Sequence, residues 1–371
     1  MLGIINKIKE VPLTTIALKA NLLCMGLSAD DSTIELFEHQ NPSGIWKTGN
    51  NGCSLEFSET RAFVSVAHQY NSNSPYHFSI KNGVIVKNGE IEKEDVKATI
   101  YPEWYSVKLS TGRSFTEVFL LEGERFFHQA YKGCDYMLGG VGCGFCSTSS
   151  RHDSEPTPLE VGEAAGIIKD HVSDAQICLG GGTYLPISAN VKYFIECVRE
   201  IRKRDVDIPV WIEMVPPSKN DIDLLIEEGA TAFGFNIELW DDKMRQSICP
   251  GKSKIPLKHY LEILEHTVKK LPNRVGSCLL VGLDTDESIK TGVDALVGIG
   301  VHPCLLPFRP FTNSKLEKSH PCGADKLIEL STYAVDCMKN NGLDLLQNQG
   351  CLLCECCTVM HDIWNLNKLE V

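Results

Sequence analysis

Long hydrophobic runs are missing from this chain of 371 residues. No stretch approaches the roughly 20 apolar residues that a membrane helix needs. Lys7, Lys9, Glu10 and Lys19 interrupt residues 1–25, where a secretory signal would carry its apolar core. We therefore expect no membrane span and a cytoplasmic location.

An excess of positive charge is missing as well. The chain has 36 Lys and Arg against 48 Asp and Glu, a formal net charge of −12. Because polyanions attract basic surfaces, this balance argues against a general binder of nucleic acids or anionic membranes. We also find no repeat of fixed period and no low-complexity segment. The length suffices for two domains or for one large α/β barrel with an appendage.

Cysteine, by contrast, is abundant, with 16 residues in the chain. In a reducing cytosol, cysteines more often indicate metal binding or catalysis than disulfides, and disulfide scaffolds are usually much shorter. Cys134, Cys143 and Cys146 lie close together in one glycine-rich stretch. Thiolates are soft ligands suited to zinc and to iron–sulfur clusters. Three of them can hold three irons of a [4Fe–4S] cluster and leave the fourth iron open to chemistry.

The composition of the chain changes at about residue 123. Residues 1–122 are β-rich, with an Asn-Gly pair at 88–89 that predicts a hairpin, and their role is unknown. Residues 123–320 alternate short apolar strands with amphipathic helices in about six β/α units, which predicts a parallel sheet with right-handed crossovers. Residues 321–371 contain a helix and a Cys-rich segment. We therefore expect an α/β fold: a partial (β/α)6 TIM-like barrel between a β-rich N-terminal domain and a Cys-rich C-terminal tail.

Polar and glycine-rich residues stand where the predicted barrel strands end, which is where a β/α barrel collects its functional groups. The cysteine loop follows the first strand. Gly180, Gly181 and Gly182 follow the second, and glycine there permits close approach of backbone to a ligand. The later strands end in further residues of this kind: Glu213, Asn236, Glu238, Gly282 and Arg309. The loop 249–252 after the fourth strand either contacts a substrate or is simply a Pro-Gly turn.

With these motifs, residues 126–320 resemble the radical S-adenosylmethionine (SAM) superfamily. The resemblance rests on the cysteine triplet, on the aromatic Phe145 before its last member, and on the triglycine one β/α unit later. It implies that Cys134, Cys143 and Cys146 hold a [4Fe–4S] cluster whose open iron binds SAM. Reductive cleavage of SAM would then give a 5′-deoxyadenosyl radical that abstracts hydrogen from a substrate.

The resemblance also implies which residues contact the cofactor. Residues 180–182 would lie at the methionine end of SAM, and Gly282 in the segment along the adenine. Asn236 and Glu238 look like residues near the ribose and the substrate in the biotin synthase and lipoyl synthase branch. The resemblance implies that Phe145 also contacts the cofactor.

Two further candidates have plain alternatives. Glu213 either binds the cofactor or is a solvated strand end. Arg309 is a candidate substrate ligand, because its planar guanidinium suits a carboxylate or phosphate; a surface ion pair is the alternative.

The chain departs from the usual family pattern in two places. Eight residues separate Cys134 from Cys143, where the usual spacing has three, and a flexible glycine-rich loop of this length still allows the thiols to converge. Thr183 stands where the family usually has a glutamate after the glycines. A zinc site formed by Cys143, Cys146 and two distant cysteines is the alternative reading.

A second group of cysteines lies near the C-terminus at 351, 354, 356 and 357, followed by His361. We interpret it as an auxiliary iron–sulfur cluster held by Cys351, Cys354 and Cys357, because adjacent Cys356 and Cys357 rarely both bind one metal. A zinc site and a redox-active tail are the alternatives.

These features together predict a radical SAM enzyme. Sulfur insertion is the leading reaction, with carbon–carbon rearrangement and methylthiolation open. We expect a small-molecule or carrier-bound substrate, a reductant such as ferredoxin or flavodoxin, and neither nucleic acid nor membrane as partner. The rival hypothesis is a non-catalytic zinc or iron–sulfur protein whose barrel only binds a partner.

Overall fold

A seven-stranded sheet forms the centre of the computed structural model, in the order β14-β13-β12-β11-β10-β9-β8. The strands from β9 to β14 run parallel to one another, and β8 pairs antiparallel with β9. The structure describes the following residues: 13–40, 52–58, 60–66, 69–99, 102–122, 125–130, 133–147, 155–204, 207–345 and 350–366.

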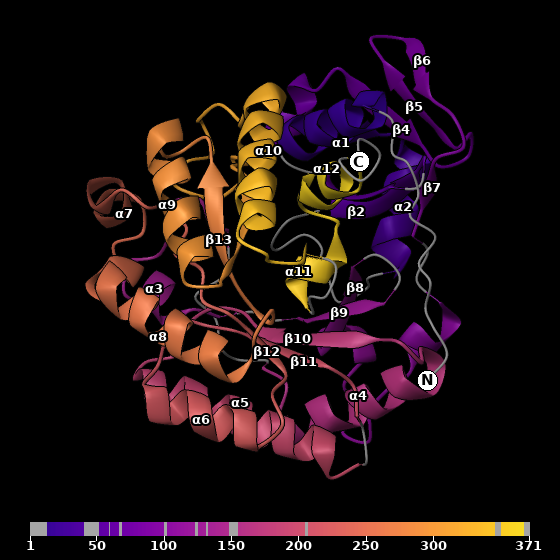
Figure 1. Ribbon diagram of the computed structural model, residues 1–371. Helices are drawn as coiled ribbons and strands as arrows, with labels where there is room; N and C mark the ends of the chain where they lie inside the picture. Colours follow the sequence, from indigo (N-terminus) through magenta and orange to yellow (C-terminus); the bar gives the residue numbers. More distant parts are fainter. Residues whose placement is uncertain are drawn as a thin grey trace.

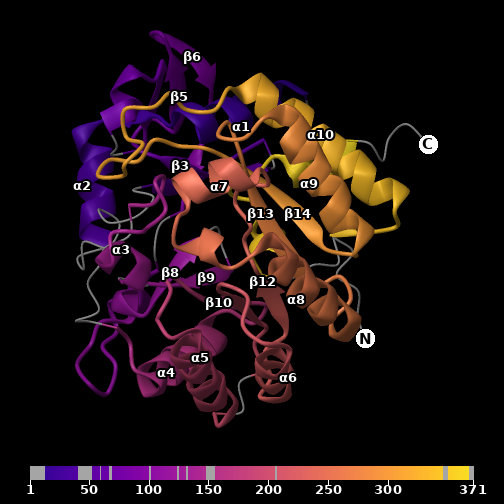
Figure 2. The ribbon, with the colours of Figure 1, turned by 90° about the vertical axis from the view of Figure 1, so that its left-hand side faces the viewer.

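The strands are short and mostly apolar, as expected for a parallel sheet covered on both faces. Helices connect them on the outside of the curved sheet (Figure 1). The strands are β8 (Phe119–Glu122), β9 (Phe126–Gln129), β10 (Gln176–Gly180), β11 (Val210–Glu213), β12 (Ala232–Gly234), β13 (Val275–Val281) and β14 (His302–Pro307). The outer helices are α4 (Pro158–His171), α5 (Ile187–Arg202), α6 (Lys219–Glu227), α8 (Leu257–Lys270), α9 (Asp286–Gly298) and α10 (Ala324–Asn340). The six parallel strands with their helices confirm the predicted partial barrel (Figure 2).

Local sequence signals begin several of these helices. Thr157 caps α4 in a capping box with Glu160, and Pro158 occupies the first helical position, where its missing N–H costs nothing. Ser218 and Thr285 cap α6 and α9, each accepting a backbone N–H three residues on. Such caps fix where each crossover helix starts, and thereby which residues remain in the loops at the strand ends.

Residues from both ends of the chain close the open side of the sheet, between its edge strands β8 and β14. Helix α1 (Leu13–Met25) packs on α10 and on β3 (Thr60–Ser65), and α12 (Met360–Leu366) packs on α10. The backbone N–H of Phe63 donates a hydrogen bond of 2.7 Å to the carbonyl of Cys356. One apolar core therefore runs from Ile16 to Trp364 and includes residues of all three predicted segments.

The N-terminal segment contains two small sheets. One comprises β1 (Ser28–Ala29), β4 (Tyr76–Ser79), β5 (Val84–Lys87) and β6 (Glu90–Lys93); the other comprises β3, β2 (Gly52–Phe57) and β7 (Lys97–Ala98). Asn88 and Gly89, with φ of 51° and 90°, form the predicted turn of the β5–β6 hairpin.

Two helices in this segment were not predicted, α1 and α2 (Asp31–Gln40). Helix α1 is buried on several sides, so its sequence lacks the one-sided apolar period by which a surface helix is recognised. None of the helices that the structure describes is both long enough and apolar enough to cross a bilayer.

Candidate functional site

The cysteine loop follows β9 at the carboxyl end of the sheet, as predicted. Cys134 precedes the one-turn helix α3 (Asp135–Leu138), and Cys143 and Cys146 lie on the loop after it. All three cysteines of this loop are half-buried. The long spacer between the first two cysteines is thus folded: α3 and a turn at Gly140, with φ of 72°, bring the chain back on itself.

The loop is anchored to neighbouring segments by backbone hydrogen bonds. Gly144 donates to the carbonyl of Ile248 at the end of α7 (Asp242–Ile248), and Leu316 donates to Gly144, at 2.7 and 3.0 Å. Gly251 donates to Val141 at 2.8 Å. The loop therefore has a defined position over the ends of the barrel strands rather than projecting into solvent.

The triglycine packs directly against Cys134. A Cβ at Gly182 would lie 2.0 Å from the carbonyl oxygen of Gly133 and 2.4 Å from Cβ of Cys134. The backbone N–H of Thr183 donates to Sγ of Cys134 at 3.4 Å, and Asp135 donates to the carbonyl of Thr183 at 2.9 Å. Only glycine allows this approach, so the triglycine and the first cysteine form one structural unit.

These features fit a [4Fe–4S] cluster with bound SAM. Three soft ligands lie on one anchored loop at the functional end of the barrel, beside a cradle of glycine backbone that a Cβ would fill. The pKa of Cys143 is raised, first by a hydrogen bond with Cys249 and then by burial. A thiol held in its protonated form becomes a ligand when a metal displaces the proton.

A charged pair lies beside the cysteine loop. Glu238 follows β12 with φ of 69°, and its carboxylate accepts a 2.6 Å hydrogen bond from Nζ of Lys252. Burial alone would lower the pKa of Lys252, but the charges of Glu238, Tyr260 and Cys143 and the hydrogen bond to Glu238 together raise that pKa well above its usual value. The loop 249–252 therefore contributes Cys249 and Lys252 to this site and is more than a turn.

Asn236 and Glu213 are joined by a hydrogen bond inside the barrel. Nδ2 of Asn236 donates to Oε1 of Glu213 at 2.6 Å, and its Oδ1 accepts the backbone N–H of Cys278 at 3.1 Å. Burial would raise the pKa of Glu213, but the nearby His128 and the hydrogen bond from Asn236 lower it. Glu213 is therefore not the solvated strand end that the sequence left open.

Several residues of the barrel interior were not predicted from the sequence. His128 on β9 and Cys304 on β14 face the barrel interior, where His128 contacts Cys178 and Cys304 contacts Cys278. Cys178 and Cys278 are buried, and they line an interior that also holds charged groups. Alternation along each strand was the available signal, because residues two apart on a strand share a face.

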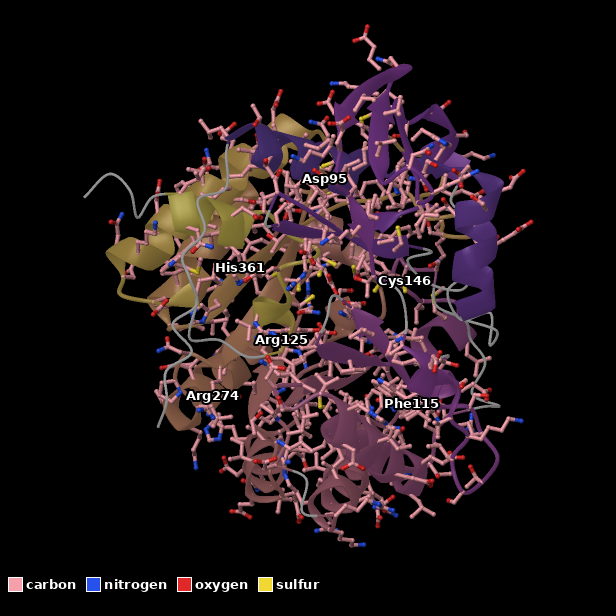
Figure 3. All side chains as sticks on the ribbon, turned by 90° about the vertical axis from the view of Figure 1, so that its right-hand side faces the viewer. Asp95, Phe115, Arg125, Cys146, Arg274 and His361 are labelled. Atoms are coloured by element: carbon pink, nitrogen blue, oxygen red, sulfur yellow. The ribbon has the colours of Figure 1, made fainter. Side chains whose placement is uncertain are left out.

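The C-terminal cysteines enter the barrel. Helix α11 (Cys351–Cys354) lies within the ring of strands in Figure 1, and Sγ of Cys354 lies 4.0 Å from a carboxylate oxygen of Glu122 on β8. The pKa of the Cys357 thiol is raised by burial and then by the charge of Glu122. Figure 3 shows sulfur atoms gathered between the labelled Cys146 and His361 in that view.

The predicted set of tail ligands is only partly described by the structure. The side chain of Cys351 lies outside the described residues. Cys356 is buried, and Cys354 shares a hydrogen bond with it. His361 is buried in α12 close to His302 of β14. The auxiliary cluster stays a prediction.

The other three candidate residues occupy different surroundings. Arg309 follows β14 and is 8% exposed; Nη1 lies 3.5 Å from the carbonyl of Phe63 and from Oγ of Ser65, so it is not on the surface. Phe145 packs on the apolar group around Leu280. Gly282 has φ of 104° and lies against Cys322, where a Cβ would come within 3.1 Å.

Comparison with known proteins adds a family to this geometry. Residues 130–296 match the radical SAM superfamily. The bacteriochlorophyllide c C-7(1)-hydroxylase of Chlorobaculum limnaeum is 26% identical over 259 residues, which span 63% of this chain and 64% of that protein. The chain thus covers less than two thirds of the hydroxylase.

Two solved structures align with about three fifths of this chain. Methylornithine synthase (PylB) aligns with a TM-score of 0.47 and 15% identity, over 60% of this chain and 66% of that one. A radical SAM methyltransferase from Sphaerobacter thermophilus aligns with a TM-score of 0.46 and 16% identity, over 62% and 67%.

Proposed function

Since the chain carries a radical SAM domain over residues 130–296, we propose that it is an enzyme that cleaves SAM reductively and abstracts a hydrogen atom from a substrate in the barrel. When bound and reduced, the [4Fe–4S] cluster and SAM supply the 5′-deoxyadenosyl radical. The observation that supports the proposal is the packing of Cys134 against the triglycine, on the loop that also carries Cys143 and Cys146.

The residues of this chain hold and orient the reactants in the proposal. Cys134, Cys143 and Cys146 bind the cluster, and the backbone at 180–182 approaches the methionine end of SAM. The Glu238–Lys252 pair, at 2.6 Å, offers both an acceptor and a donor for the ribose and for polar substrate groups. Both side chains are mostly buried, so their hydrogen bonds to a ligand would be strong and their positions are fixed.

The barrel interior holds the substrate in this proposal, and the C-terminal segment limits its size. Gly350 donates a 2.7 Å hydrogen bond to Oε1 of Gln176, which fixes the start of α11 against β10. Arg309 would bind a carboxylate or phosphate of a small-molecule or carrier-bound substrate, since it lies close enough to Glu122 and Cys357 to affect the pKa of each. An electron donor of the ferredoxin or flavodoxin type would supply the reductant.

Two outcomes for the substrate radical are open to experiment. Sulfur insertion is the first candidate, and the thiols of Cys354 and Cys357 at the barrel interior are what favours it. Hydroxylation is the second candidate, because the curated relative is named a hydroxylase. A product heavier by one sulfur or by one oxygen atom distinguishes them in mass spectrometry.

The test of SAM cleavage uses anaerobically purified, reconstituted protein. We expect about four irons and four sulfides per chain for one cluster, or about eight of each with an auxiliary cluster, and formation of 5′-deoxyadenosine after reduction. Cys143→Ala should abolish 5′-deoxyadenosine, whereas Cys197→Ala, a buried thiol in α5 away from the loop, should retain it. Stoichiometric zinc without iron, and no 5′-deoxyadenosine, would support the rival zinc-protein hypothesis instead.

The role of the tail cysteines has its own test. Cys354→Ala should leave part of the SAM cleavage intact, since Cys354 is not in the cysteine loop, but should stop formation of the product. If Cys354→Ala converts the substrate like the wild type, the result contradicts both the auxiliary cluster and sulfur donation by Cys354.

A further inference from the structure

Three side chains with metal-binding atoms meet inside the barrel below the triglycine. His128, Cys178 and Glu213 come from the neighbouring strands β9, β10 and β11, and their donor atoms all lie within 4.8 Å of one another. Cys178 pairs in register with His128, and Glu213 pairs with Gly180. The parallel pairing of three strands, rather than a sequence motif, brings these side chains together.

The hydrogen bonds of His128 fix which ring nitrogen is available. Nδ1 lies 3.1 Å from the carbonyl oxygen of Gln129, and because a carbonyl only accepts, Nδ1 is the donor. In neutral imidazole the lone pair therefore stands on Nε2, which lies 3.7 Å from Oε2 of Glu213. A histidine that binds a metal almost always donates its other N–H in this way.

Glu213 is oriented by a comparable contact. Its Oε1 accepts the hydrogen bond of Asn236 at 2.6 Å, while Oε2 is the oxygen on the His128 side. Asn236 is itself fixed by the N–H of Cys278 at 3.1 Å. Each of these two ligand candidates thus has one atom held by a neighbour and one directed toward the group.

We propose that His128, Cys178 and Glu213 bind one divalent metal ion, zinc or iron(II), separate from the [4Fe–4S] cluster. Imidazole, thiolate and carboxylate are ligands of both metals. Donor atoms about 2.1 Å from a tetrahedral ion lie about 3.4 Å apart, close to the 3.7 Å between Nε2 and Oε2. Small movements of these side chains therefore complete the site.

Charge balance favours the ion. A Cys178 thiolate and the Glu213 carboxylate together carry two negative charges, which a divalent cation neutralises in the barrel interior. Two further charges of opposite sign act on this group: Glu122 on His128 and Cys178, and Lys252 on Glu213. The site with its ion is thus close to neutral, which lowers the cost of burying these groups.

Three protein ligands leave a fourth position for another donor. The side chains of His128 and Glu213 keep 28% and 22% of their surface exposed, so the site is open to small molecules. A Cβ on Gly180 would lie 3.0 Å from that of Glu213, so the site is adjacent to the triglycine. The ligand class is an oxygen or sulfur donor, such as a carboxylate, hydroxyl, carbonyl or thiol on the substrate.

Cobalt(II) is the probe that tests this site independently of SAM chemistry. The full-length variant with Ala at positions 134, 143 and 146 lacks the cluster ligands and is titrated anaerobically with Co²⁺. We expect one Co²⁺ per chain and a near-ultraviolet thiolate-to-cobalt charge-transfer band. Added to this variant, Cys178→Ser should remove the band, and His128→Ala should weaken binding roughly 100-fold or more, because each change deletes a ligand.

Matched controls separate this site from the other thiols. Cys278→Ala removes an interior thiol that contacts Cys304 and should leave both the band and the affinity unchanged. Asn236→Ala keeps all three ligands but releases Glu213, and should weaken binding roughly 10- to 100-fold. Circular dichroism establishes that each variant is folded.

Three results would overturn the proposal. One is the absence of stoichiometric Co²⁺ binding; another is an unchanged band in Cys178→Ser. The third is loss of the band in Cys354→Ala with Cys178→Ser unaffected, which would assign the metal to the tail cysteines. None of these results depends on whether the reconstituted wild type cleaves SAM.

Discussion

At the scale of single residues, the position of the cysteine loop depends on a glycine that has no side chain. Gly182 has no Cβ, and that absence allows residues 133 and 134 to lie against the triglycine. This contact, rather than the long spacer that follows, sets where the thiol of Cys134 lies.

Gly182→Ala is therefore expected to displace the cysteine loop without unfolding the barrel. Because a Cβ would come within 2.4 Å of that of Cys134, we expect less bound iron and roughly 100-fold slower SAM cleavage, the loss typical of a misplacement of about 1 Å. Iron analysis and assay of 5′-deoxyadenosine measure the two effects.

Gly166→Ala is the matched control. A Cβ on this glycine of α4 has no neighbour within 4 Å among the described residues, so the change should keep activity and stabilise the helix by about 1 kcal/mol. Equal iron content and activity in Gly182→Ala and the wild type would contradict the role of the glycine contact.

At the scale of elements, a buried ion pair ties the first helix to the last. Nζ of Lys19 on α1 lies 2.7 Å from Oδ2 of Asp362 on α12, and Lys19 is fully buried. Lys19 also donates to the carbonyl of Glu355, and Thr60 donates to Oδ1 of Asp362 at 2.5 Å. The pair thus links α1, β3 and α12, which together cover the open side of the barrel.

Lys19→Met should lower the free energy of unfolding by about 3–5 kcal/mol, because it leaves the Asp362 carboxylate buried without its cation. The double variant Lys19→Met with Asp362→Leu should regain a large part of this loss. Urea unfolding followed by circular dichroism measures both.

An exposed pair provides the comparison. Lys169 and Asp207 form a 2.7 Å ion pair with side chains 36% and 80% exposed. Lys169→Met should cost less than about 1 kcal/mol, since solvent screens such pairs. If Lys19→Met costs no more than Lys169→Met, the buried pair does not hold the two ends of the chain together.

At the scale of the whole molecule, the barrel is completed by segments distant in sequence. The sheet itself stops at β8 and β14, and α1, α12 and the interior segment at α11 close it. His302 at the start of β14 lies in this closure, close to His361 of α12. The stability of the closure should therefore depend on the protonation of the buried His302 ring.

Acid is expected to destabilise the fold through His302. Burial lowers the pKa of His302 from 6.5 to about 4. The unfolded chain binds the proton below pH 6.5 and the folded chain only near pH 4, so stability falls as the pH drops through that range, by about 3 kcal/mol at most. Above pH 7 this residue contributes no pH dependence.

Urea unfolding of the anaerobic protein between pH 4 and 8 measures this slope. His302→Gln removes the titrating ring and should flatten the curve between pH 6.5 and 4. The same slope in wild type and His302→Gln would show that other groups cause the acid sensitivity.

The sequence by itself determined the β/α alternation, the caps that begin α4 and α9, and the positions of the cysteine triplet and triglycine. These are local patterns, readable because neighbouring residues along the chain make them. Only the tertiary structure decided that Lys252 faces Glu238, that α1 meets α12, and that His128, Cys178 and Glu213 converge. Strand order and register place residues from separate strands side by side, and no single stretch of sequence encodes that arrangement.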